Sequence, residues 1–494
     1  MSNPLLVTAM LLTGAIALWG ILDTEGLAQT ADLLVSVQFA SRDWFIMLTV
    51  SAVLILSLIV AVSPYGRLRL GKDDERPEFS TVSWLTMLFA AGMGVGLLYW
   101  GTAEPVSHYL LLVNGGGPED AAAAALFLTN FHWGVHAWAI YALTGLVIAY
   151  FGFRLGCPSL VSAPIIKIFG TSRITVAAGW VIDLLAIVAI AIGLGGSVAM
   201  GVFQIKAGID ALFGLEETGL GLALVVFAVL CLAYLPPLLV ELSKGMAVLS
   251  NAAMAIATAL LLFILITGPT AFIMGGVVQA FGDYAGNSLV HGFRTFTFMD
   301  SQVEDWFQDW TLTYMVWWLA WAPFVGVFIA RISRGRTIRE FILGVILGPT
   351  LFSILWFGVF GSIGFFAALR TDLPILDVVR DNVDGVTFFV LDQLPLAALT
   401  TAMVVCAAFL FLVTSVVSAS FVLGMFSTGG NLDPPRRIKL VWGVLLGALG
   451  LVMILSGSID AVRSIIALGA LPFVFVILIL AVCLLKALKR EQLQ

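Results

Sequence analysis

Three tryptophans lie within five residues of one apolar segment, where residues 311–340 read TLTYMVWWLAWAPFVGVFIARISRGRTIRE. Trp317, Trp318 and Trp321 precede Pro323, which we expect to interrupt the helix because proline removes a backbone donor. Irregular backbone at membrane depth is tolerated only inside protein or along a water-filled cavity. Indole rings present their negative π faces to cations. The segment is therefore predicted to line a binding site for an organic cation or a zwitterion.

A second aromatic group stands in the segment FHWGVHAWAIY, which contains Trp133, Trp138 and Tyr141. Trp138 and Tyr141 are three residues apart and so are neighbours on a helix surface. Aromatic residues in membrane helices most often form belts at the ends of spans, whereas this group begins well inside an apolar run. His132 and His136 have a spacing that suits a metal, but the favoured interpretation is packing or hydrogen bonding between helices.

Glycines alternate in the segment GMGVGLLYWGTAEP, where Gly92, Gly94 and Gly96 cannot share one helix face. This spacing argues against a simple packing seam and predicts an unwound segment whose backbone meets a ligand or an ion. Glu104 stands next to Pro105 and is expected to cap a half-helix that starts again there, because a carboxylate is stabilised at a helix N-terminus.

Two adjacent hydroxyl residues, Thr414 and Ser415, interrupt the apolar run FLVTSVVSAS. Their hydroxyls either bond back to a carbonyl of the preceding turn or serve as oxygen ligands for a small hard cation. The spacing alone leaves both interpretations open.

The composition is that of an integral membrane protein. Of 494 residues, 61% are apolar and only 11% are charged, with a mean hydropathy of +1.07, whereas soluble domains carry about 25% charged residues. Isolated cysteines indicate neither a disulfide framework nor a CxxC metal site, and no basic patch suggests a nucleic-acid partner. Twelve segments are apolar enough to cross a hydrocarbon core of ~30 Å: 5–22, 44–63, 82–112, 121–150, 174–208, 218–239, 245–274, 311–332, 337–369, 391–427, 437–457 and 461–487. We interpret the first as a retained span and not as a signal peptide.

Lysine and arginine alternate between the two sides of these spans. The loops after every second span, together with the C-terminus, hold 18 of the 24. This asymmetry predicts that both termini are cytoplasmic.

The two interrupted segments each open a block of five spans, a pattern typical of inverted-repeat secondary transporters with a site at mid-membrane. The predicted fold is therefore an all-α membrane protein. Its predicted units are two N-terminal spans with a cytoplasmic loop (1–80), a first repeat (81–275), an outer amphipathic segment (276–310), a second repeat (311–487) and a short tail (488–494).

The glycine segment, the segment FHWGVHAWAIY and above all WWLAWAPFVGVFIARISRGRTIREF resemble the betaine/choline/carnitine transporter family, over about residues 5 to 485. The resemblance implies the LeuT-like fold of sodium/amino-acid symporters, preceded by two extra helices. It also implies a homotrimer in the bacterial inner membrane, surrounded by lipid, that moves trimethylammonium substrates by alternating access. Two other classes of membrane protein are rivals to a transporter. A membrane enzyme would need paired histidines on facing helices, and a channel would conduct without stoichiometric coupling.

The resemblance also assigns binding residues. A quaternary ammonium cannot donate N–H bonds, so cation–π attraction of ~2 kcal/mol or more per desolvated contact must hold it. The family's aromatic box corresponds to Trp133, Trp138, Tyr141 and Trp318, and its inner route corresponds to Trp317 and Trp321.

The family's sodium site is implied at the carbonyls of Ala90, Met93 and Phe411 and the hydroxyls of Thr414 and Ser415. Sodium-independent exchangers of the family carry an arginine in the seventh helix, where this chain has Met254, so sodium coupling is expected. Sodium is expected as the coupling ion, and no cofactor is expected. A second sodium site would fall on Ile190 and Leu194, whose side chains cannot ligate sodium.

Substrate charge follows from Gly96, where choline-specific members carry an aspartate. The absence of that charge favours a net-neutral zwitterion, with glycine betaine as the leading case, whose carboxylate would meet backbone N–H groups of residues 92–96. Dimethylsulfoniopropionate, carnitine and partly methylated glycines remain open. The alternatives are a sodium-independent exchanger of carnitine or betaine and a transporter of choline or dimethylsulfoniopropionate. The short tail LLKALKREQLQ favours nutrient uptake over osmotic regulation.

Overall fold

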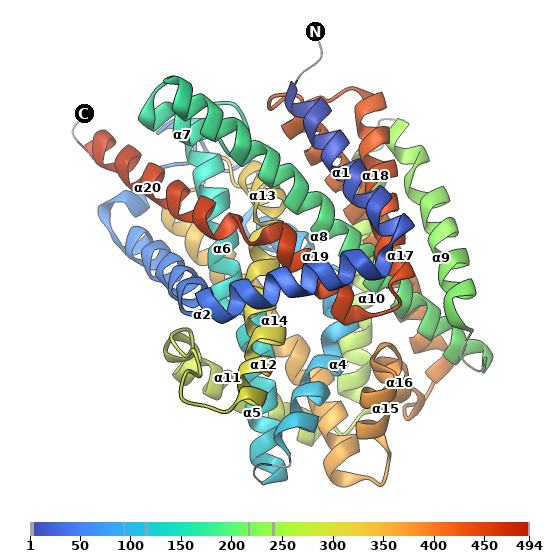
Figure 1. Cartoon of the computed structure of the whole chain (residues 1–494). Coiled ribbons are helices and arrows are strands. Elements are labelled where there is room, and N and C mark those ends of the chain that lie inside the picture. Colours follow the sequence, from blue (N-terminus) through green and yellow to red (C-terminus); the bar gives the residue numbers. More distant parts are fainter. Residues whose placement is uncertain are drawn as a thin grey trace.

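The computed structural model describes residues 4–92, 94–113, 115, 117–215, 218–239 and 243–492, and its regular structure there is helical apart from one isolated antiparallel bridge between Arg69 and Thr337. Helices of very different length pack into one bundle, with both termini on the same side (Figure 1). The α-helices are α1 (Pro4–Leu22), α2 (Thr24–Val62), α3 (Thr81–Gly92), α4 (Val95–Leu112), α5 (Pro118–His132), α6 (Val135–Ala149), α7 (Ala163–Phe169), α8 (Arg173–Phe213), α9 (Gly219–Tyr234), α10 (Ser243–Thr267), α11 (Thr270–His291), α12 (Ser301–Trp306), α13 (Thr313–Ile332), α14 (Ile338–Arg370), α15 (Ile375–Asp381), α16 (Val386–Asp392), α17 (Ala397–Ser427), α18 (Arg436–Leu455), α19 (Ile459–Ala470) and α20 (Phe473–Gln492). The 3₁₀ segments are η1 (Pro64–Arg67), η3 (Pro236–Leu239) and η5 (Val383–Gly385), and the π-helical segments are η2 (Tyr150–Arg154) and η4 (Phe307–Leu312).

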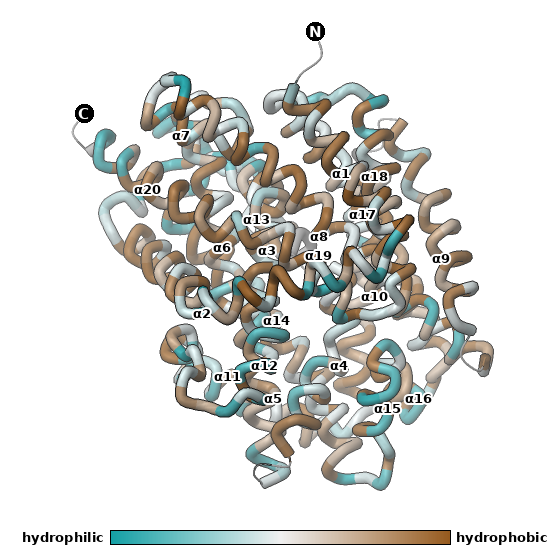
Figure 2. The backbone as a smooth tube through the Cα atoms, viewed as in Figure 1, coloured by the Kyte–Doolittle hydropathy of each residue, from teal (hydrophilic) through white to brown (hydrophobic). Residues whose placement is uncertain are grey.

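Ten helical segments among the described residues are long and apolar enough to cross a membrane, and α19 with α20, bent by 40°, makes an eleventh. The predicted span 82–112 is divided between α3 and α4, on either side of Met93, which lies outside the described residues. The protein is thus a multi-span helical membrane protein, and the count of twelve stays a prediction. Figure 2 shows that hydrophilic residues gather near the end that carries the termini and near the opposite end, around α12 and α15.

Local sequence explains where several helices begin. Asp23 caps α2 by accepting a hydrogen bond from the Gly26 backbone N–H at 2.9 Å, so α2 starts at Thr24 and not near residue 44 as predicted. Thr337 and Glu340 form a capping box at the start of α14, in which each side chain satisfies a backbone donor of the other.

Burial separates the helices into a centre and a periphery. In the most apolar stretch of the segment Pro118–Arg154, 89% of residues are buried, and in that of Ser301–Ile332 the share is 83%, against 28% for Pro4–Leu22. The two segments that carry the aromatic groups are therefore the ones held inside the bundle. Their helices α6 and α13 pack against each other, and α8 packs against α17 and α18.

Two predictions about helix irregularities are wrong. Helix α13 runs without a break through Pro323, and the irregular stretch is instead the π-helical η4 that precedes α13. One missing donor is tolerated there because Pro323 is fully enclosed by neighbouring helices. Glu104 does not cap a restarted half-helix, because α4 begins at Val95 with Gly94 in extended conformation as its N-cap, which leaves Glu104 in the middle of the helix. The predicted interruption itself does lie at the glycines, between α3 and α4.

Candidate functional site

A small cavity lies where the start of α4 meets α8, α13, α17 and the junction of α5 with α6. Its volume is about 30 Å³, which has room for one or two water molecules. Fourteen residues line it: Gly94, Val95, Gly96, Trp133, Leu194, Ser197, Val198, Met200, Trp317, Trp318, Trp321, Leu412, Ser415 and Val416. None of these fourteen side chains carries a charge.

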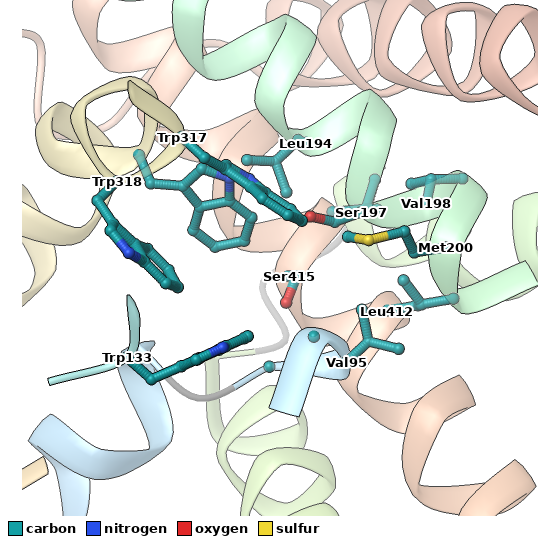
Figure 3. A pocket seen from close by; sticks show the side chains of 14 residues that line it. Val95, Trp133, Leu194, Ser197, Val198, Met200, Trp317, Trp318, Leu412 and Ser415 are labelled. Carbon is teal, nitrogen blue, oxygen red and sulfur yellow. The ribbon is translucent and has the colours of Figure 1, made fainter. Parts of the chain in front are cut away.

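Indole rings form one wall of this cavity, and Figure 3 shows Trp133, Trp317 and Trp318 facing a common space. The ring centroids of Trp133 and Trp318 are 5.0 Å apart and the rings meet edge to face at 71°. Trp317 stacks on Trp318 with an interplanar angle of 14°. Three rings from two segments far apart in the chain thus converge on the cavity, and their role in substrate binding stays a prediction.

The other predicted box residues lie behind this wall. Tyr141 packs against Trp318 with centroids 6.0 Å apart, and Trp138 packs against Tyr141 at 5.4 Å. Both side chains are buried and neither lines the cavity. Trp317 and Trp321, which the sequence places along an inner route, line the same cavity as Trp318.

A second helix interruption, which the sequence analysis does not foresee, places Trp133. Helix α5 ends at His132 and α6 begins at Val135, with Trp133 and Gly134 between them. A Cβ atom at Gly134 would lie 1.8 Å from the Tyr284 hydroxyl oxygen, which accepts a hydrogen bond from the Val135 backbone N–H at 2.7 Å. Glycine at position 134 was the available signal, since only glycine admits another side chain this close.

The same interruption anchors Trp318. Its indole Nε1–H donates to the His132 backbone carbonyl at 2.7 Å. His132 is the last residue of α5, and carbonyls in the last turn of a helix lack partners within it. The ends of the two half-helices therefore hold both principal indoles of the wall.

Glycines form the opposite side of the cavity. A Cβ atom at Gly96 would lie 3.1 Å from the Trp133 ring, and one at Gly94 would lie 4.0 Å from the Ser415 hydroxyl oxygen. The backbone of α4 therefore approaches both the indole wall and α17 closely. Nothing is described of the surroundings of Gly92, the third predicted glycine, although α3 ends there.

The predicted sodium ligands are partly brought together. Ser415 lines the cavity across from Gly94, while the Thr414 hydroxyl donates to the carbonyls of Leu410 and Phe411, both at 3.0 Å. This is the back-bonded arrangement that the spacing leaves open. Met93 lies outside the described residues, as does the side chain of Ala90. At the positions where a second sodium site would fall, Leu194 lines the cavity and Ile190 is buried; both side chains are apolar, and a second site is not expected.

Some site residues escape sequence reasoning. The Tyr314 ring lies 5.9 Å from the rings of both Trp317 and Trp318 and 5.7 Å from Trp133. Its spacing of three and four residues from the two tryptophans is a signal that could have found it. Ser197 and Met200 of α8 also line the cavity, but small or apolar residues inside a long apolar helix give no sequence signal.

Comparison with known proteins shows the family of this chain. Residues 4–493 match the family described as "BCCT, betaine/carnitine/choline family transporter". The glycine betaine transporter OpuD of Bacillus subtilis (strain 168) is 38% identical over 486 residues, which cover 97% of this chain and 93% of the relative. A probable glycine betaine transporter of Desulfitobacterium hafniense is 34% identical, with 98% of each chain covered. The ectoine/hydroxyectoine transporter of Virgibacillus pantothenticus is 32% identical, covering 91% of this chain and 89% of the relative. The chain therefore belongs to the betaine/carnitine/choline family, whose members are transporters and not enzymes.

Proposed function

We propose that this protein imports a zwitterionic quaternary-ammonium or sulfonium compound of the glycine betaine type, coupled to sodium. The single observation that carries the proposal is a cavity walled by four tryptophans, with no charged side chain among the described residues that line it. Indoles attract a cation that cannot donate hydrogen bonds. An uncharged lining balances no net charge, so it suits a ligand whose own carboxylate neutralises its ammonium group.

Glycine betaine is the substrate that the remaining observations favour. Gly94 and Gly96 present backbone to the cavity at the start of α4, where unpaired N–H groups of a helix N-terminus attract a carboxylate. Two of the relatives above are named as glycine betaine transporters. The alternative substrates are dimethylsulfoniopropionate, carnitine and choline, of which choline lacks the carboxylate.

Transport by alternating access fits the size of the cavity. A cavity of about 30 Å³ has room for one or two water molecules, so a substrate with eight non-hydrogen atoms requires the surrounding helices to separate. The interruptions between α3 and α4 and between α5 and α6 both lie beside the cavity, and we propose that the half-helices on either side of each interruption move relative to one another. We propose that residues 81–275 and 311–487 form the two inverted repeats of a LeuT-like fold that rock against each other.

Sodium is proposed to bind between the interrupted helix and α17. The donors would be the Ser415 hydroxyl, which faces Gly94, the hydroxyl of Thr414, the carbonyl of Phe411 and the backbone of residues 90–93. Oxygen donors of this kind suit a small hard cation. Thr414 would give up its back-bond to Leu410, whose carbonyl keeps its helical partner. The rival is a sodium-independent exchanger.

Assembly and orientation complete the proposal. We propose that the protein assembles as a homotrimer in the bacterial inner membrane, as the family resemblance implies. Cytoplasmic termini fit the excess of lysine and arginine in the loops on one side of the spans. Both termini lie on one side of the bundle (Figure 1), as that orientation requires.

The test is a thermal-shift panel followed by uptake into proteoliposomes. Glycine betaine, dimethylsulfoniopropionate, carnitine, choline and dimethylglycine are each added to the purified protein with and without sodium. The expected result is stabilisation by glycine betaine, strengthened by sodium, and uptake driven by an inward sodium gradient. A response to choline alone would overturn the substrate class. Uptake that is the same with and without sodium would replace symport by exchange.

A further inference from the structure

A fully buried carboxylate lies next to the indole wall without touching the cavity. Glu104, in the middle of α4, has no exposed surface and is absent from the cavity lining. Its Oε2 accepts hydrogen bonds from the Trp133 Nε1–H at 2.8 Å and from the Tyr314 hydroxyl at 2.5 Å. Its Oε1 lies 2.7 Å from Nδ1 of His132. One carboxylate thus joins α4 to the α5–α6 junction and to α13.

Each partner of Glu104 belongs to the indole wall or supports it. Trp133 forms the wall itself, and the Tyr314 ring packs on Trp133 and Trp318. The His132 carbonyl accepts the Trp318 indole N–H, while Nε2 of the same histidine lies 2.9 Å from the Thr311 hydroxyl oxygen. Glu104 therefore holds one principal indole directly and the other through His132.

Such an arrangement needs a reason, because a buried carboxylate is unfavourable unless donors satisfy it. Three donors converge on Glu104, and hydrogen bonds to an ionised acceptor are stronger and more directional than neutral ones. An apolar residue at this position would remove the burial penalty but would leave the Trp133 N–H and the Tyr314 hydroxyl without their acceptor. A carboxylate at this position therefore orients the Trp133 indole and the Tyr314 hydroxyl by accepting their hydrogen bonds.

We propose that Glu104 is a positioning residue that sets the angle between Trp133 and Trp318 and so determines affinity for the substrate's ammonium group. The inference rests on the proposed function, because it assigns the cage to an ammonium ligand. It also links recognition to movement. The helix that carries Glu104 begins with the residues that face the cavity, so a shift of α4 changes the cage geometry.

A metal ion is the competing explanation for this cluster. Glu104, His108 and His132 place one ligand atom each within 4.8 Å of one another. However, the Trp306 indole N–H donates to Nδ1 of His108 at 3.3 Å, so a neutral His108 carries its proton on Nε2. That protonated nitrogen lies 3.4 Å from the Glu104 Oε1 atom without forming a hydrogen bond to it, and it has no lone pair to offer a metal. The hydrogen-bond directions therefore favour a network of donors around the carboxylate.

The test is a double-mutant cycle of Glu104→Gln and Trp133→Phe, with sodium present. Trp133→Phe removes the indole donor and keeps an aromatic ring. Each single change is expected to raise the dissociation constant of glycine betaine by about 10- to 100-fold, the equivalent of one lost bond to a charged group. The double variant should be weaker than the worse single variant by less than about twofold. Multiplying effects would overturn the proposal, because they would mean that the two groups act independently.

A ligand-free measurement separates this proposal from the substrate assignment. In protein labelled with 5-fluorotryptophan, difference spectra of Trp133→Phe and Trp318→Phe identify two of the fourteen ¹⁹F resonances. Glu104→Gln should shift or broaden both and leave in place that of Trp442, whose indole N–H donates to the Ser427 hydroxyl and not to Glu104. Unmoved Trp133 and Trp318 resonances would refute positioning. If Glu104→Gln shifted these two resonances but the wild-type protein bound no glycine betaine, the proposed substrate would be wrong and the positioning role of Glu104 would stand.

The matched control is Asp183→Asn. Asp183 is also a buried carboxylate, bonded to the Ser162 backbone N–H at 2.9 Å and to the Ser162 hydroxyl at 2.6 Å, but it has no contact with the cage. Its substitution is expected to lower the melting temperature and to leave the betaine dissociation constant within about twofold. An equal loss of affinity in Asp183→Asn would reduce Glu104 to a general stability residue. A stoichiometric divalent metal in the purified wild type that is lost in Glu104→Gln would assign the cluster to metal binding instead.

Discussion

Two pairs of tryptophans have similar distances between their ring centroids, but only one pair has a cationic side chain of the protein against its rings. In the first pair, Trp100 of α4 and Trp310 of η4 have centroids 5.5 Å apart, and the Arg463 guanidinium lies 4.7 Å from one ring and 4.1 Å from the other. In the second pair, Trp133 and Trp318 are 5.0 Å apart, and no charged side chain lines the cavity beside them. The first pair thus makes its cation–π contact with an arginine of the protein, whereas the second pair is free to make one with a ligand.

The difference explains why aromatic residues alone do not define a binding site. Arg463 is only 9% exposed, and the two indoles compensate part of its lost hydration through cation–π attraction. The first pair is therefore a structural contact that joins α19 to α4 and η4. The second pair has an adjoining cavity and a backbone wall of glycines, and these features make it a candidate site for a mobile cation.

The largest expected effect comes from Trp318→Ala. This change removes one of the four indole rings that wall the cavity and should abolish glycine betaine uptake into proteoliposomes, a loss of at least about 100-fold. Gel filtration should show an unchanged assembly. Trp100→Ala is the matched control in the first pair, and it should retain measurable uptake because its ring faces Arg463. Full transport by Trp318→Ala would refute the cage.

A charge placed in the second pair should change its selectivity. Gly96→Asp puts a carboxylate beside Trp133, since a Cβ atom there would lie 3.1 Å from the ring. The variant should lose affinity for glycine betaine by about tenfold and gain affinity for choline, because a net-neutral ligand no longer matches the site. Competition of both compounds for binding measures the ratio, with Gly96→Asn as the uncharged control of equal size. An equal change in both variants would mean that bulk and not charge sets selectivity.

The two pairs also show what a single sequence can and cannot reveal. Alternating glycines and clustered tryptophans are conspicuous because they are rare choices in an apolar helix. The glycines correctly predict the interruption between α3 and α4, while the binding role of the tryptophans stays a prediction. The role of Glu104 was missed, since its partners lie 28 to 210 positions away along the chain. Pro323 misled for a related reason. Proline predicts a local defect, but the packing around α13, which keeps the helix continuous, is invisible in the segment itself.

Removal of the internal cation should affect stability more than binding. Arg463→Gln leaves Trp100 and Trp310 without their cation and is expected to destabilise the protein by about 1–2 kcal/mol, measured as a lower melting temperature. The betaine dissociation constant should stay within about twofold, because the second pair has its own supports. Arg380→Gln, which affects an exposed arginine paired with Asp377, serves as the control with little effect on either quantity. A tenfold change in affinity in Arg463→Gln would show that the two pairs are coupled.

The smallest expected effect tests whether the indoles or a carboxylate hold Arg463. Asp460 lies 3.4 Å from the Arg463 guanidinium, but its side chain is 82% exposed. Exposed ion pairs contribute about 0–1 kcal/mol and weaken with salt, so Asp460→Asn should lower stability by less than about 0.5 kcal/mol, a difference that disappears in high salt. Thermal melts of Asp460→Asn and Arg463→Gln at two salt concentrations make the comparison. If the two variants lost the same stability, Arg463 would be held by its carboxylate, and the first pair would lose its status as an aromatic cation site filled by the protein itself.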